Sequence, residues 1–292
     1  MLEAVPNVSE GRDPAAIEAI GRAFGSRARL LDVHADPDHH RSVFTLVGEE
    51  EDLVESLLQG TARALERVDL RRHDGVHPRV GAVDVVPLVP LRPEHMQLAK
   101  RAALALADRI GEELAVPVFL YGEVGAGRRP AFFRRGGLAE LTRRLDQGEV
   151  ETAAGRPQQV DPRSGAVLVG ARPLLVAYNV DLATDDVAVA REIAAAVRES
   201  GGGMSGVQAI GLRLPGSGRV QVSMNVIDLA RAPLHEVYVR VLGEAEGRRV
   251  KPVGGELVGL VPESVLAAAR AAGVEVPGVD ESRVLERLIQ SA

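Results

Sequence analysis

Hydrophobic and polar residues follow one another along the first half of the chain in the order expected for strand, helix, strand, strand, helix and strand. Alternation and β-branched content predict strands at 2–8, 29–35, 42–47 and 82–88. The first helix begins at the N-cap residue Asp13, which Pro14 follows, and apolar residues at helical spacing predict the second at 53–68. This order is the split βαβ, or ferredoxin-like, arrangement.

The second half of the chain repeats this order. Before it come a predicted helix at 95–114, a strand at 118–121, and a segment rich in Gly, Arg and Pro at 125–163 that we interpret as a connection or lid. Strands are then expected at 173–182, 206–214, 219–227 and 253–260, helices at 186–199 and 234–245, and a closing helical part at 263–290. We therefore predict an α/β (α+β) protein with two ferredoxin-like βαββαβ subdomains, residues 1–170 and 171–292.

Alternation within the strands predicts one polar face for each sheet. In 219–227, four apolar residues alternate with polar ones that include Gln221 and Asn225. Asn is scarce in this chain and is generally depleted in strands, yet Asn7 and Asn179 also lie on predicted polar faces. A face that is only solvated is the alternative, but Thr, Arg or Glu would serve that purpose. We expect the two polar faces to face each other and to enclose a ligand cleft.

Composition narrows the classes of function. The net charge is −6, and the chain has no Trp and few other aromatic residues, which argues against a nucleic-acid-binding protein. The absence of Cys excludes disulfides, thiolate nucleophiles and Cys-ligated zinc. We find no apolar stretch long enough to cross a membrane and no signal peptide, so we expect a cytoplasmic protein that binds neither membranes nor nucleic acid.

Five of the seven histidines fall into two groups, His34, His39 and His40 in the first and His73 and His77 in the second. A His-x3-His pair binds a metal from one side only when its segment is helical. Gly75 lies within that pair and Pro78 directly follows it, so a helix is disfavoured. We therefore expect no metal.

His77 is better interpreted as a general base. Its loop leads into the strand at 82–88, where Pro78 stiffens the backbone and Arg79 adds a positive charge. An imidazole with an ordinary pKa near 6.5 can accept and return a proton near neutral pH. The alternative from composition alone is a loop histidine hydrogen-bonded to backbone.

Several motifs resemble one known family along almost the whole chain. They include VPNVSEG at 5–11, HDGVHPRVGAVD at 73–84 and VQVSMN at 220–225, with further matches at 30–33, 41–48, 117–123, 165–172, 178–180 and 256–262. The sequence resembles the formiminotransferase (glutamate formimidoyltransferase) family, including the transferase part of the bifunctional formiminotransferase–cyclodeaminase. The cyclodeaminase part has no counterpart here.

The resemblance implies transfer of the formimino group from N-formimino-L-glutamate to tetrahydrofolate, a step in histidine breakdown, with tetrahydrofolate as co-substrate. It places the catalytic histidine at His77. Its folate-binding stretch falls on Pro157, Pro162, Arg163, Ser164 and Gly165, although the residues between the matching positions differ. For the substrate we expect binding by Asn7, Arg79, Asn179, Gln221 and Asn225. Some family members carry an acidic residue where this chain has His34, which puts any supporting role at that position in doubt.

Other functions stay open at this point. One is formyl transfer between N-formylglutamate and 5-formyltetrahydrofolate, and another is a non-catalytic ferredoxin-like protein that binds folate or an amino acid. Metal-dependent hydrolysis is a more distant alternative. The motif around His77 favours an enzyme over a binding protein. A homodimer is one option for the assembly.

Overall fold

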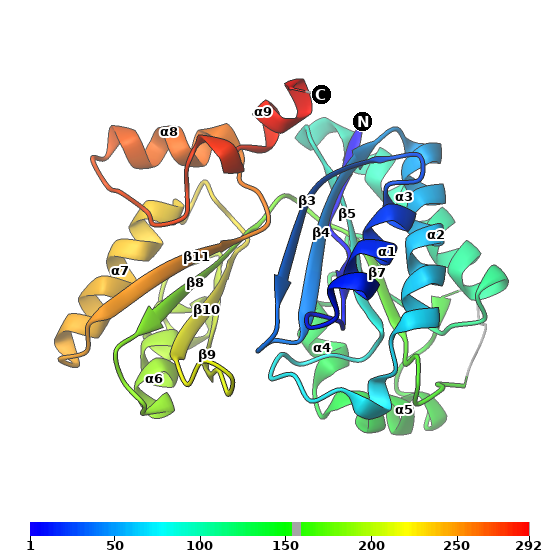
Figure 1. Cartoon of the computed structure of the whole chain (residues 1–292), viewed down its shortest axis with the longest axis horizontal. Coiled ribbons are helices and arrows are strands. Elements are labelled where there is room, and N and C mark those ends of the chain that lie inside the picture. Colours follow the sequence, from blue (N-terminus) through cyan, green and yellow to red (C-terminus); the bar gives the residue numbers. More distant parts are fainter. Residues whose placement is uncertain (154–158, 292) are drawn as a thin grey trace. The chain divides into compact units, whose positions relative to one another are not determined.

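The chain divides into two compact units, Met1–Pro173 and Leu174–Ala292. The computed structural model describes residues 1–153 and 159–291, and each unit combines one β-sheet with helices (Figure 1). None of the helices in these described ranges is long and apolar enough to span a membrane.

The first unit is built on a mixed sheet. Its strands, within the described residues, are β1 (Leu2–Ala4), β2 (Asn7–Val8), β3 (Arg29–Asp36), β4 (Arg41–Gly48), β5 (Val83–Pro90), β6 (Val118–Gly122) and β7 (Val167–Ala171). The short strands β1 and β2 both lie between β4 and β5 and are antiparallel to them, and β3 pairs with the far edge of β4. This part has the predicted split βαβ order. The sheet then continues with β7 and β6, which run parallel to β5.

Helices cover both faces of this sheet. Its helices are α1 (Pro14–Phe24), α2 (Glu50–Arg67), α3 (Met96–Glu113), α4 (Pro130–Arg134) and α5 (Gly137–Asp146). The side chain of Asp13 accepts hydrogen bonds from the first backbone N–H groups of α1, which confirms the predicted N-cap. The first three helices pack on one face, whereas α4 and α5 form a smaller core with β5, β6 and β7 through residues such as Phe119, Phe133 and Leu141.

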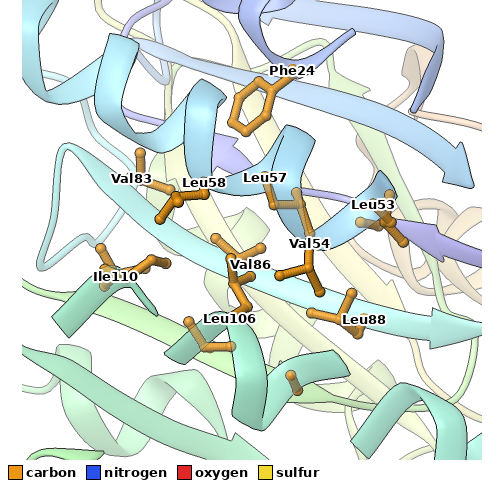
Figure 2. Packing of buried hydrophobic residues seen from close by; sticks show 14 of the residues in the cluster. Phe24, Leu53, Val54, Leu57, Leu58, Val83, Val86, Leu88, Leu106 and Ile110 are labelled. Carbon is orange, nitrogen blue, oxygen red and sulfur yellow. The ribbon is translucent and has the colours of Figure 1, made fainter. Parts of the chain in front are cut away.

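The main core of the first unit joins three helices to the sheet. Leu57 of α2, Val86 of β5 and Leu106 of α3 are fully buried and lie close together, with Phe24 of α1 beside them (Figure 2). Burial of each such side chain contributes about 1.5–3 kcal/mol. This core therefore holds β5 rigidly, and β5 begins directly after the loop that carries His77.

The second unit has an antiparallel sheet in the order β11-β8-β10-β9. Its elements in the described ranges are β8 (Val176–Leu182), α6 (Val187–Val197), β9 (Val207–Arg213), β10 (Val220–Val226), α7 (Leu234–Gly247), β11 (Pro252–Val258), α8 (Glu263–Ala271) and α9 (Leu285–Gln290). The alternate apolar residues of β10 are all buried in one core with residues of α6 and α7. The alternation predicted for this strand is thus confirmed, and Gln221 and Asn225 lie on the opposite face.

Three elements of the structure differ from the prediction. The strand at 2–8 is divided into β1 and β2 around Pro6, which has no N–H to donate to a neighbouring strand. The closing helical part at 263–290 is two helices, because Gly273, Pro277 and Gly278 lie between α8 and α9. Strand β7 was not predicted. It is buried along its whole length, so its sequence lacks the alternation that marks a half-buried strand.

Candidate active site

The loop between α2 and β5 carries His77, and several hydrogen bonds hold its backbone. The guanidinium of Arg79 donates to the carbonyl oxygens of Gly75 and His77, the latter at 2.6 Å. The N–H of Val80 donates to Asp84 Oδ1 at 2.7 Å. Arg79, which we expected to bind substrate, therefore braces the loop that carries His77 in this structure.

His73 has a structural role in this loop. Its Nε2 donates to the carbonyl oxygen of His40 at 2.7 Å, and its Nδ1 accepts from the N–H of Gly75 at 3.2 Å. The two imidazole rings of His40 and His73 stack with their centroids 4.1 Å apart. Burial, and secondly the charge of Arg79, lower the pKa of His73 to about 4. Since both ring nitrogens are engaged, His73 is a poor candidate for the base.

The imidazole of His77 is held as a hydrogen-bond acceptor. Its Nε2 lies 2.9 Å from Nη1 of Arg41 on β4. A guanidinium only donates, so Nε2 accepts and the proton of the neutral ring resides on Nδ1. Burial lowers the pKa of His77 well below its ordinary value, and the charge of Arg41 lowers it further. The residue as a whole is half-buried, and its imidazole is a neutral hydrogen-bond acceptor.

A buried ion pair lies beside this histidine. Asp84 of β5 is 2% exposed, and its second carboxylate oxygen pairs with the guanidinium of Arg134 on α4. Burial, followed by the charge of Arg134, lowers the pKa of Arg41 to about 10. Sequence reasoning missed Arg41 and Arg134 as site residues. Arg41 begins one of the motifs, but Arg134 lies in the segment interpreted as a connection or lid and carried no local signal.

The predicted folate-binding stretch contacts both ends of the His77 loop. Pro157 lies outside the described residues, and Pro162 is exposed. The carbonyl oxygen of Arg163 accepts from the N–H of Leu70 at 2.9 Å, and that of Ser164 accepts from the N–H of Ala82 at 2.8 Å.

Gly165 closes this turn with φ +70°, where a Cβ would lie 2.2 Å from the carbonyl oxygen of Val80. Only glycine fits that position. The fold thus places the predicted folate-binding stretch next to the loop that carries His77.

Asn7 and His34 lie on one face of the first sheet together with Arg41. Both Asn7 on β2 and His34 on β3 pair with Val43, from opposite sides. Directly paired residues share a face, as do residues two apart in a strand, so Arg41 projects from that face too. The amide of Asn7 donates to the carbonyl oxygen of Val5 at 2.9 Å, which orients its side chain.

Carboxylates orient the predicted amides of the second unit. Asn179 donates to Glu256 at 3.1 Å, and Gln221 donates to Asp181 at 2.9 Å. Asn179 and Gln221 are buried, whereas Asn225 is exposed. Of the three amides predicted to bind substrate in this unit, Asn225 is therefore the one that is open to solvent. Asp181 and Glu256 are further candidates that sequence reasoning did not single out.

Histidines and acids gather around the His77 loop without forming a recognisable metal centre. Within the ranges 1–153 and 159–291, no group of three or more His, Cys, Asp or Glu residues is arranged to hold a metal ion.

The Arg41–His77 pair gives a prediction that needs no assay of activity. Replacing Arg41 by Gln removes a positive charge that disfavours the protonated imidazole, so the pKa of His77 should rise. An NMR pH titration of the histidine ring signals, with His77→Ala to assign the signal, measures this. In the parent protein His77 should stay neutral well below pH 6.5. A signal that titrates at the same pH in both proteins would contradict the pairing.

Comparison with family models assigns nearly all of the chain. A model described as the N-terminal subdomain of the formiminotransferase domain matches residues 1–172, and one described as the formiminotransferase domain matches residues 177–275. The chain belongs to the formiminotransferase family. The resemblance stated from the motifs is confirmed.

Curated members of this family align over most of the chain. A glutamate formimidoyltransferase from Thermoplasma acidophilum is 37% identical, and the match covers 100% of this chain and 98% of that protein. One from Streptococcus pyogenes is 36% identical over 91% of this chain and 90% of that protein. A formimidoyltransferase-cyclodeaminase from Sus scrofa is 40% identical over 93% of this chain. The chain spans 52% of that longer, bifunctional protein.

Proposed function

We propose that this chain is a glutamate formimidoyltransferase, which transfers the formimino group from N-formimino-L-glutamate to tetrahydrofolate and yields 5-formiminotetrahydrofolate and glutamate. The two single-function relatives that align along nearly their whole length carry this name. The structural observation that carries the proposal is a neutral His77 whose Nε2 is an acceptor, next to the folate stretch.

Proton transfer is the task that this site can perform. Attack of N5 of tetrahydrofolate on the amidine carbon forms a C–N bond and leaves N5 positively charged. His77 takes the N5 proton on Nε2 as the hydrogen bond from Arg41 gives way. The imidazolium then returns that proton to the glutamate nitrogen, whose bond to the amidine carbon breaks. A positioned group that acts in both directions contributes about 10²–10⁴-fold.

Binding roles follow from where the other residues lie. We assign folate binding to the turn that contains Pro162, Arg163, Ser164 and Gly165, with Pro157 preceding it outside the described residues. Its backbone anchors to Leu70 and Ala82 support this assignment, because they give the turn a definite shape beside the base. Asn7, Arg79, Asn179, Gln221 and Asn225 stay the predicted substrate residues. That the two sheets face each other across a ligand cleft also stays a prediction.

A parallel assay tests the proposed function. Tetrahydrofolate is offered with formiminoglutamate, formylglutamate or formylaspartate, and transfer is followed spectrophotometrically. We expect turnover with formiminoglutamate at the highest kcat/KM. Faster transfer from formylglutamate would support the alternative of formyl transfer, and binding of folate without turnover of any donor would indicate a non-catalytic protein.

Asn225 offers a separate test of substrate binding. Its side chain is exposed, so Asn225→Ala should change the free energy of unfolding by less than about 0.5 kcal/mol. Loss of one hydrogen bond to a charged substrate should raise KM about 10-fold. Thermal melting and steady-state kinetics measure the two effects. A large fall in melting temperature with an unchanged KM would show that Asn225 is structural.

A further inference from the structure

Positive charge exceeds negative charge around His77. The groups that act on its imidazole through their charge are Arg41, Arg79, Arg134 and His39, and each of them disfavours the protonated ring. The nearby carboxylates are already engaged. Asp84 pairs with Arg134 and accepts from Val80, and Asp36 accepts from the N–H of His39 at 2.7 Å.

Two of these arginines have unused hydrogen-bonding capacity. In the part of the chain that the structure describes, the guanidinium of Arg41 makes a hydrogen bond to His77, which leaves most of its five N–H groups available. The Nε of Arg134 is buried without a hydrogen-bond partner among the described residues. Buried donors normally have partners, and the planar fork of a guanidinium matches a carboxylate. A carboxylate is one partner that fits such donors.

We propose that Arg41 and Arg134 form an anion site that binds a carboxylate of the amino-acid substrate beside His77. The proposal rests on the proposed function for the identity of that substrate. In formiminoglutamate, the amidine carbon is joined to the α-carbon through one nitrogen, and the α-carboxylate is attached there. Because Arg41 also contacts Nε2 of His77, a carboxylate bound to Arg41 brings the amidine carbon close to the base.

The glutamate tail of the folate is the other source of a carboxylate. It is separated from the reacting N5 by the C9–N10 bridge and the aminobenzoyl ring. A tail carboxylate on Arg41 would therefore hold N5 far from His77. The chemistry of the reaction thus favours the amino-acid substrate as the occupant.

A bound carboxylate also changes the pKa of His77. A negative charge a few ångströms away favours the protonated imidazole and opposes the effect of the arginines. The pKa of His77 therefore rises when the substrate binds. The charged groups that act on the ring are Arg41 on β4, His39 in the turn after β3, Arg79 in the loop and Arg134 on α4. The carboxylates Asp36 on β3 and Asp84 on β5 act on the neighbouring Arg41. His77 becomes a stronger base only when there is a substrate to act on.

The first experiment uses L-glutamate, the reaction product, as the probe. Ring signals of the histidines are followed by NMR against pH, with and without saturating L-glutamate and without tetrahydrofolate. We expect the pKa of His77 to move upward with L-glutamate, and this movement to disappear in Arg134→Gln. An unchanged titration of His77 in the presence of bound L-glutamate would overturn the proposal.

The second experiment separates the two sources of the carboxylate. In Arg134→Gln we expect KM for formiminoglutamate to rise about 10- to 100-fold, with KM for tetrahydrofolate within about two-fold. Arg135→Gln is the matched control, since Arg135 is the next residue and its side chain is exposed. A rise confined to KM for tetrahydrofolate, or for its polyglutamylated form, would overturn the assignment to the amino acid.

Two further measurements distinguish loss of the anion site from loss of the fold and from failure of the proposed function. Arg134→Gln leaves Asp84 buried without its partner, so the double variant Arg134→Gln with Asp84→Asn removes both charges together and should keep the fold. It should still lose the response of His77 to L-glutamate, and retention of that response would overturn the proposal. A parent protein that binds L-glutamate and shifts His77 but transfers no formimino group would refute the proposed function and leave the anion site intact.

Discussion

Replacing His77 by alanine is expected to lower kcat for formimino transfer by about 10²–10⁴-fold, equal to about 3–5 kcal/mol of transition-state stabilisation. The reason is that His77 is the neutral imidazole whose Nε2 accepts a hydrogen bond beside the folate stretch. Steady-state transferase assays at saturating concentrations of both substrates measure the fall in kcat. KM should change little, since we assign substrate binding to other residues.

The pH profile sharpens this test. Because the pKa of His77 in the free protein lies well below its ordinary value, the acid limb of kcat/KM should fall below pH 6.5 in the parent protein. That direction corrects the expectation from sequence of a pKa already close to neutral. His235→Ala is the control, as His235 belongs to neither histidine group. Near-normal turnover of His77→Ala would show that His77 is not the base.

Replacing Asp84 by alanine is expected to reduce the stability of the first unit by about 3–5 kcal/mol, the typical effect of removing one partner of a buried ion pair. Asp84 is 2% exposed and interacts with both Arg134 and the N–H of Val80. Its loss leaves a buried guanidinium without a counter-ion and releases the end of the His77 loop. Urea unfolding measures the stability, and the transferase assay should show a parallel loss of activity.

Two variants show whether this effect belongs to the ion pair. Asp84→Asn keeps an acceptor for Val80 and should cost less than Asp84→Ala. Asp146→Ala, which removes an exposed carboxylate at the end of α5, should change the free energy of unfolding by less than about 0.5 kcal/mol. If Asp84→Ala were no more harmful than Asp146→Ala, the pair would contribute nothing to the stability of the unit.

The sequence by itself determined those features that depend on residues close together in the chain. The alternation in β10 identified which side chains enter the core, because successive residues of a strand point to opposite faces. The N-cap at Asp13 was predictable, since its carboxylate accepts from the next N–H groups along the chain. The motifs also sufficed to identify the family and to single out His77.

Only the tertiary structure decided which distant residues meet. Arg41 and His77 are 36 residues apart, and Asp84 and Arg134 are 50 apart. No local pattern links such pairs, because the cost of closing a loop depends only weakly on its length. Residues far apart in the sequence can therefore become neighbours without any periodic signal. The position of β7 between β5 and β6 in the sheet is likewise a contact between distant segments that local sequence did not predict. His77 was therefore singled out from local sequence, whereas the lowered pKa of its imidazole depends on burial and on arginines that the fold brings to it.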